Sequence, residues 1–200
     1  MKKILNVSNI ALIAVLGALG AVLMVIDFPI FVAPSFYKLD LGDLPCVIGA
    51  LALGPIPALF IQIVKIIIKL LIKPTSTAFV GEIAAFVFSS MYCVIAASLY
   101  SIKKTKKNAY VAILISSLIS VIITCIGNYY FIIPSYVKLF NMPLAAIIGA
   151  GNAIFPMVKD KLSFVLYCVA PFNLIKFVLV GILTILLYKR VSNIIKNIQK

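Results

Sequence analysis

The chain has 200 residues, of which 64% are apolar and 12% charged, and its mean hydropathy is +1.21. A soluble globule cannot bury that much hydrocarbon, so lipid must be the solvent and soluble enzymes are excluded. The formal net charge of +13 does not indicate a nucleic-acid partner, because the basic residues cluster between apolar runs rather than on a water-facing surface. We therefore predict an all-α integral membrane protein with a single domain, residues 1–200.

The residue types that build catalytic and metal centres are scarce. The chain has no histidine, five scattered acidic residues and four cysteines that stand singly in apolar stretches. Without CxxC spacing or clustered ligands, neither a disulfide framework, a zinc site nor histidine-based acid–base catalysis is indicated. We expect no enzymatic activity, no cofactor and no metal site. The cysteines are interpreted as small core residues: Cys46, Cys93, Cys125 and Cys168.

Apolar runs separated by polar breaks predict six transmembrane helices. The expected ranges are 7–26, 44–54, 56–72, 79–100, 109–132 and 162–188. The first run follows Met1-Lys2-Lys3, and its full spanning length favours an uncleaved helix over the alternative of a signal peptide. The short second run ends at Gly54-Pro55-Ile56-Pro57, a turn signal that predicts two separate helices rather than one long one.

The distribution of charge predicts the orientation. Under six alternating spans, one side holds basic residues without any acid: Lys2, Lys3, Lys103, Lys104, Lys106, Lys107, Lys189, Arg190, Lys196 and Lys200. The opposite side holds every acid, Asp27, Asp40, Asp43, Glu82 and Asp160, together with Lys38, Lys73, Lys138, Lys159 and Lys161. Cytoplasmic loops are enriched in Lys and Arg, so both termini are predicted to be cytoplasmic, where the basic clusters also meet anionic lipid.

Two long connections are expected on the outer face, at 27–43 and 133–161. Both contain prolines, and the first also carries aromatic residues, among them Phe36 and Tyr37. Loops of this length in a compact domain are usually lids or binding loops. We expect them to cover a ligand that arrives from outside.

Three lysines lie within the predicted helices, where a charge at the centre costs about 2.5–3.5 kcal/mol. Lys69, with Lys73 four residues later, is near the outer end of its helix and is interpreted as snorkelling to the interface. For Lys65, a structural role and a place on a path to a cavity are equal alternatives. Lys176 is too deep to snorkel easily and shares a helix face with Asn173.

Further polar residues lie at a similar depth from the outer side. Asn128 precedes Tyr129, Tyr130 and Phe131, and Glu82 is in the first turn of its helix. Each alone could be a contact between helices. Together, two amides, one lysine and one carboxylate interleaved with aromatic residues indicate a pocket for a polar-edged aromatic ligand. The candidate binding residues are Glu82, Asn128, Asn173 and Lys176.

The first helix has a face of small residues that includes Ala14-xxx-Ala18 and Gly17-xxx-Ala21. Small residues at this spacing let another helix approach closely. Packing inside the protein and docking on a partner are equal alternatives for this face. The glycines do not form a nucleotide-binding loop, so active transport would draw its energy from a partner or an ion gradient.

Four segments in order resemble one known family. They are Phe36-Tyr37-Lys38-Leu39-Asp40 with Pro45, then Gly81-Glu82, then Gly127-Asn128-Tyr129-Tyr130, and finally Tyr167 to Lys176 with Asn173 between them. Over nearly the whole chain the sequence resembles the riboflavin-specific substrate-binding (S) component of energy-coupling factor transporters. One departure is Leu41-Gly42-Asp43, where we expect a Phe-Ser-Glu-like stretch.

The resemblance implies a six-helix protein of the cell membrane that captures riboflavin outside, with the first outer loop as a gate. The residues corresponding to the binding site are Glu82, Asn128, Asn173 and Lys176, joined in the loop by Phe36, Tyr37 and Asp40. It also implies that Ala14 and Ala18 dock on a membrane-embedded coupling subunit, whose two cytoplasmic ATPases drive toppling and release inside. The alternatives are the same architecture for another vitamin, a stand-alone ion-coupled carrier and an intramembrane enzyme.

Overall fold

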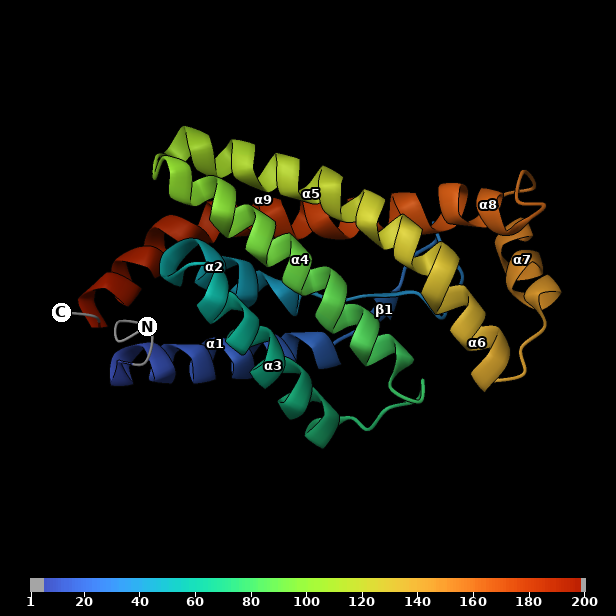
Figure 1. The fold of residues 1–200 in the computed structure, drawn as a ribbon, viewed down its shortest axis with the longest axis horizontal. Helices are drawn as coiled ribbons and strands as arrows, with labels where there is room; N and C mark the ends of the chain where they lie inside the picture. Colours follow the sequence, from blue (N-terminus) through green and yellow to red (C-terminus); the bar gives the residue numbers. More distant parts are fainter. Residues whose placement is uncertain (1–5, 199–200) are drawn as a thin grey trace.

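The computed structural model describes residues 6–198, with side chains through residue 188, as a bundle of long helices (Figure 1). Five helical segments are long and apolar enough to cross a membrane: Val7–Val25, Pro55–Ile72, Val80–Ile102, Lys106–Leu139 and Lys161–Tyr188. The run predicted as the second span is a shorter apolar helix, Asp43–Leu53. Of the basic residues predicted to be cytoplasmic, Lys2, Lys3 and Lys200 lie outside the described residues, as do the side chains of Lys189, Arg190 and Lys196.

The predicted helices of the first half of the chain are confirmed. They are α1 (Val7–Val25), α2 (Asp43–Leu53), α3 (Pro55–Ile72) and α4 (Val80–Ile102). The predicted break between α2 and α3 lies at Gly54, whose φ of 102° is a backbone conformation that side chains rarely adopt. Pro55 then begins α3 at a position where a helix does not need a backbone N–H.

The last two predicted helices each contain a π-helical turn that sequence reasoning missed. One continuous segment consists of α5 (Lys106–Gly127), η1 (Asn128–Ile132) and α6 (Ile133–Leu139). The other consists of α8 (Lys161–Phe164), η2 (Val165–Val169) and α9 (Ala170–Ile198). In both, a proline, Pro134 or Pro171, is the second residue after the π turn. Proline clashes with the carbonyl four residues earlier, and the wider π turn accommodates it without ending the helix.

The two outer connections contain more regular structure than predicted. Residues 27–43 form a small antiparallel hairpin of β1 (Phe28–Pro29) and β2 (Lys38–Leu39), so the fold is not purely helical. The prediction of one long loop at 133–161 is wrong, because α6 and α7 (Leu144–Asn152) occupy much of it. Pro134 lies just inside α6 and Pro143 just before α7, positions where helices tolerate proline.

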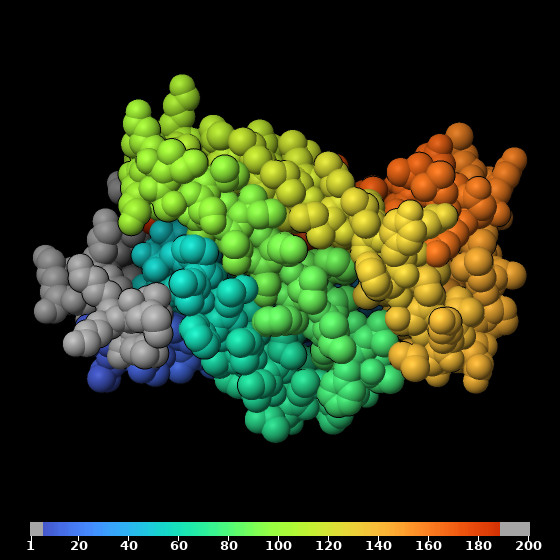
Figure 2. Space-filling model, viewed as in Figure 1, coloured from blue at the N-terminus to red at the C-terminus, as the bar shows by residue number. Residues whose placement is uncertain are grey.

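The helices run back and forth between two ends of the molecule. The start of α1, the α4–α5 turn and the end of α9 lie at one end in Figure 1, α6, α7 and α8 lie at the other, and β1 lies between them. One apolar core contains residues of α1, α2, α3, α4 and α9. It includes Tyr92 and Phe177, whose ring centroids are 4.8 Å apart. A second core joins the hairpin loop to α6, α7, α8 and η2 around Phe164. In Figure 2 the yellow surface of α6 adjoins the green surface of α4.

Gly42 explains the departure of 41–43 from the expected pattern. A Cβ atom at Gly42 would lie 2.8 Å from the Gly20 carbonyl oxygen and 2.7 Å from Met24 Cβ. A Cβ at Gly20 would in turn lie 2.9 Å from the Gly42 carbonyl oxygen. The loop therefore crosses α1 backbone to backbone, a contact that a serine would obstruct.

The conformation of Gly54 predicts a specific cost of substitution. Gly54→Ala should lower the free energy of unfolding by about 1–3 kcal/mol, because its φ and ψ belong to a region essentially restricted to glycine. Nothing lies within 4 Å of the added methyl group, so the penalty is conformational. Gly149→Ala is the matched control, since it also meets no neighbour but lies in α7, where alanine gains about 0.5–1 kcal/mol. Unfolding in detergent measures both, and equal effects would contradict the prediction.

Candidate functional site

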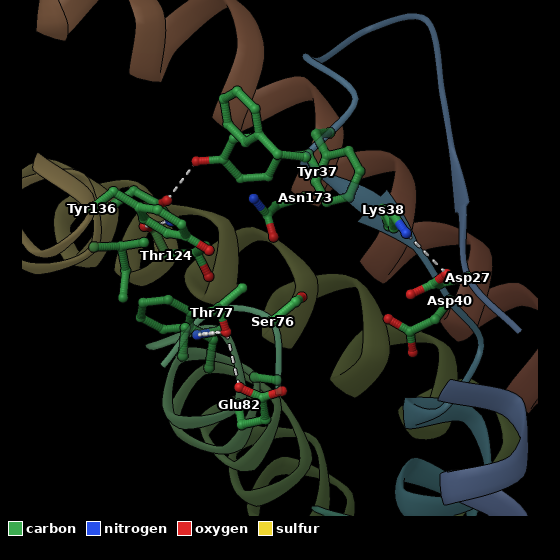
Figure 3. A pocket seen from close by; sticks show the side chains of 18 of the residues that line it. Asp27, Tyr37, Lys38, Asp40, Ser76, Thr77, Glu82, Thr124, Tyr136 and Asn173 are labelled. Carbon is green, nitrogen blue, oxygen red and sulfur yellow. Dashed lines mark hydrogen bonds and ion pairs between the residues drawn. The ribbon is translucent and has the colours of Figure 1, made fainter. Parts of the chain in front are cut away.

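A cavity of about 560 Å³ lies between the two cores, within the size range of small-molecule sites. The hairpin loop, the α3–α4 connection, α4, the η1 region and α9 contribute to its wall, as the close-up in Figure 3 shows. The candidate residues that line it are Phe36, Tyr37, Asp40, Glu82, Asn128, Asn173 and Lys176. The structure therefore brings all seven predicted binding residues together, although they are far apart in the sequence.

The two amides lie at or close to the π-helical turns: Asn128 begins η1, and Asn173 follows η2 by four residues. Asn128 Oδ1 accepts a hydrogen bond of 2.8 Å from the Tyr37 hydroxyl, and its Nδ2 donates to the Thr124 carbonyl. Burial raises the pKa of Tyr37 far above its usual range, so the hydroxyl stays protonated as a donor. Asn173 Nδ2 donates to the Val169 carbonyl at 2.8 Å, and its side chain lies beside the cavity in Figure 3. Each amide thus keeps some hydrogen-bonding capacity for a ligand.

The Glu82 carboxylate is held by three donors. Lys69 Nζ lies 2.5 Å from Glu82 Oε1. The hydroxyls of Thr75 and Thr77 both donate to the second carboxylate oxygen, Glu82 Oε2, at 2.9 Å. The interpretation of Lys69 as snorkelling to the interface is wrong, because its side chain is mostly buried and paired with Glu82. Sequence spacing missed the threonines because they belong to the connection before α4, with no helical periodicity to place them.

A second charge cluster lies at the rim of the cavity. Asp27 binds Lys73 at 2.9 Å and Lys38 at 3.4 Å, and all three side chains are partly exposed. Burial raises the pKa of Asp27, but its hydrogen bond to Lys73 and the two lysine charges outweigh this and hold the pKa below its usual value. The rim is therefore an ion-paired contact between the hairpin and the end of α3.

The floor of the cavity holds a buried network of two acids and two lysines. Lys176 Nζ lies 2.8 Å from Asp40 Oδ2 and 3.4 Å from Asp43 Oδ2. Asp43 Oδ1 lies 2.6 Å from Lys65 Nζ. Neither Asp43 nor Lys65 is among the lining residues, so the structure favours the structural alternative for Lys65.

The aromatic residues that follow Asn128 are not part of the cavity lining. Tyr130 and Phe131 are exposed, and Tyr129 stacks under the Lys161 ammonium. They are consecutive residues of η1, and consecutive positions of a helix point in different directions, so they cannot all share the face of Asn128. The aromatic lining residues are Phe36, Tyr37, Phe88, Tyr136, Phe140, Phe172 and Phe177.

The small-residue face of α1 divides into two stripes. Gly17 and Ala21 are buried, and a Cβ at Gly17 would lie 2.5 Å from Val64 Cγ1, so this stripe packs against α3. Ala14 is exposed and Ala18 half-buried. Gly17 and Ala21 therefore fit the alternative of packing inside the protein, whereas Ala14 and Ala18 are available for docking on a partner.

Comparison with known proteins places the chain in a family. The family model for the ECF transporter, substrate-specific component, matches residues 8–188. The chain belongs to this family. It is thus a multi-pass membrane protein of a transporter family. Among the described residues, no group of three or more Cys, Asp or Glu side chains could hold a metal ion.

Named relatives and a solved structure agree with this assignment. The chain is 29% identical over 177 residues to the riboflavin transporter RibU of Staphylococcus aureus, covering 88% of this chain and 86% of the relative. It is 27% identical over 145 residues to the riboflavin transporter FmnP of Bacillus subtilis, covering 69% and 76%. The solved S component of a bacterial ECF transporter superposes with a TM-score of 0.71 at 26% identity, over 94% of this chain and 96% of that one.

The two lysines at the end of α3 should differ in their contributions to stability. Lys69→Met leaves the buried Glu82 carboxylate without its cation and should lower the free energy of unfolding by about 3 kcal/mol. Lys73→Met breaks a partly exposed pair and should cost less than about 1 kcal/mol. Denaturant unfolding of both variants in detergent checks the difference. Similar losses would show that the Glu82 site is solvated rather than buried.

Proposed function

We propose that this protein is the riboflavin-binding S component of an ECF transporter. Membership of the family supports the transport role, and the relatives named as riboflavin transporters support the ligand. The protein would capture the vitamin outside and release it inside after docking on an ATP-driven coupling module. It has no catalytic activity in this proposal, and riboflavin is its cargo rather than a cofactor.

One observation carries the choice of ligand: every charged group that lines the cavity is already paired within the protein. Asp27 pairs with Lys38 and Lys73, Glu82 with Lys69, and Asp40 with Lys176. Such a pocket suits an uncharged ligand that hydrogen-bonds at its edges and stacks by its faces. Riboflavin is neutral, with an aromatic ring system, a carbonyl and imide edge and a chain of hydroxyl groups.

Each candidate residue has a role in this proposal. Asn128, Asn173 and Lys176 recognise the carbonyl and imide edge of the ring, and Glu82 accepts from the ribityl hydroxyls. Phe36, Tyr37 and Asp40 belong to the loop that opens and closes over the ligand. The bonds from Tyr37 to Asn128 and from Lys176 to Asp40 support this, because they connect the loop to the recognition groups.

The proposal also includes the topology and the partners. The chain would form a single domain with six spans, α2 being a short buried one, and both termini in the cytoplasm. The end of the bundle that holds the α4–α5 turn carries Lys103, Lys104, Lys106 and Lys107, which supports this orientation and contact with anionic lipid. Ala14 and Ala18 would dock on the transmembrane coupling subunit, which associates with two cytoplasmic ATPases.

Titration of the purified protein with riboflavin tests the ligand. The protein alone in detergent should quench riboflavin fluorescence tightly with one-to-one stoichiometry, and it should carry yellow flavin from the cells that produced it. Folded protein that binds no riboflavin but binds another vitamin would replace the ligand and keep the family. Uptake by this chain alone, abolished by an uncoupler and insensitive to ATP depletion, would favour an ion-coupled carrier instead.

The role of Asn173 gives a quantitative prediction. Asn173→Ala should weaken riboflavin binding at least about tenfold, because a buried ligand group loses its hydrogen-bond partner. Asn108→Ala is the matched control, since that amide, at the start of α5, donates to the Leu99 carbonyl near the end of α4, at the far end of the bundle. The control should bind like the unmodified protein in the same fluorescence titration. Equal affinities of the two variants would remove Asn173 from the site.

Docking and binding should separate by mutation of α1. Ala14→Leu with Ala18→Leu should leave riboflavin affinity unchanged and abolish uptake, because the added bulk prevents close approach of a partner helix. Val15→Leu with Leu19→Phe adds bulk at other exposed positions of α1 and serves as the control. Uptake by cells or vesicles that contain the complete transporter measures the effect. Normal uptake by the first variant would contradict the docking role.

A further inference from the structure

We propose that Asp43, together with Lys65, positions the Lys176 ammonium for the ligand. Lys176 lines the cavity, whereas Asp43 and Lys65 lie behind its wall. Asp43 and Lys65 would therefore act on the ligand only through Lys176. This inference rests on the proposed function, because it concerns how the riboflavin site is built.

Asp43 uses both carboxylate oxygens to join three helices to the start of α2. Its Oδ1 accepts from Lys65 Nζ at 2.6 Å and from Gln62 Nε2 at 3.3 Å, both on α3. Its Oδ2 accepts from Ser89 Oγ at 2.8 Å, on α4, and lies 3.4 Å from Lys176 Nζ, on α9. The Asp43 side chain is fully buried, so these contacts fix its position in the absence of water.

Lys176 has two carboxylate partners that differ in their attachment. Asp40, at 2.8 Å, belongs to the loop between β2 and α2, and its other oxygen accepts from the Gly42 backbone N–H. Asp43 belongs to α2 and is held by α3 and α4. A loop that opens for the ligand would carry Asp40 away, and Asp43 would keep the ammonium at the floor of the cavity.

Lys65 is required because the buried Asp43 carboxylate needs a cation of its own if Lys176 is to remain available to the ligand. The network contains two acids and two lysines and is neutral as a group. Lys65 is buried and lies close to Asp43, so its positive charge compensates most of the negative charge of that carboxylate. The longer 3.4 Å separation leaves Lys176 less tightly bound to Asp43 and able to donate to a ligand oxygen.

A double-mutant cycle tests this positioning role. Asp43→Asn with Lys65→Met removes the pair without leaving a buried charge, and Lys176→Met removes the group on which the pair is proposed to act. In a protein that keeps Lys176, the paired change should weaken riboflavin binding about tenfold, as expected for coupling between contacting groups. In the Lys176→Met background it should change the affinity by less than about twofold, because nothing remains to be positioned.

A milder variant and a control complete the experiment. Gln62→Met removes one donor to Asp43 and keeps all four charges, so it should weaken binding about two- to threefold, again only when Lys176 is present. Thr184→Val changes a buried polar residue of α9 outside the cavity and should not alter the affinity. If Asp43→Asn with Lys65→Met does not fold, Gln62→Met carries the same test. Unfolding temperatures of all variants separate a loss of stability from a loss of affinity.

The outcomes distinguish this inference from the proposed function. If the unmodified protein binds riboflavin and the losses disappear in the Lys176→Met background, the positioning role is supported. If it binds riboflavin but the losses add to that of Lys176→Met, or never occur, Asp43 is only structural and this inference fails alone. If the unmodified protein binds no riboflavin, the proposed function fails and this inference fails with it.

Discussion

The buried Asp43 carboxylate is the contact on which the arrangement of this bundle depends. A carboxylate in an apolar interior is tolerated only when cations and hydrogen-bond donors satisfy it. Asp43 begins α2, its hydrogen-bonding partners Lys65 and Gln62 come from α3 and Ser89 from α4, and Lys176 approaches it from α9. Satisfying this one side chain therefore fixes four helices relative to one another and leaves the cavity directly above them.

The geometry of the upper wall depends on the two prolines that follow π-helical turns. Pro134 and Pro171 each remove a backbone donor, and η1 and η2 absorb the resulting change of register. Asn128 is the first residue of η1, and Asn173 lies four residues after the end of η2. Tyr130 and Phe131, inside η1, face outward, while both amides line the cavity. Both amides that face the cavity are thus at or close to a π-helical turn.

The sequence predicts much of this fold because lipid imposes a strong constraint: helical runs must be long, apolar and bounded by charge. The ends of α1 to α4 follow from that constraint, and so does the gathering of Glu82, Asn128, Asn173 and Lys176 at similar depth. The partners of these residues could not be predicted, because Thr75 and Thr77 lie in a connection without periodicity. The buried position of Lys69 was missed because helix depth alone does not reveal a facing acid. The π turns depend on hydrogen-bond register, which no residue spacing reports.

The loop and the ligand-binding groups are bound to one another, and this sets a condition on binding. The Tyr37 hydroxyl donates to Asn128 Oδ1, and Asp40 accepts from Lys176 Nζ. Two loop residues therefore hydrogen-bond to the groups proposed to recognise the ligand. A ligand that takes a hydrogen bond from Lys176 must share the ammonium with Asp40 or displace it, and each weakened bond loosens the loop at that point. The hairpin keeps its separate connection to α3 through Asp27 and Lys73 at the rim. Opening the loop completely requires both connections to break, whereas adjusting it around a ligand requires only the inner one.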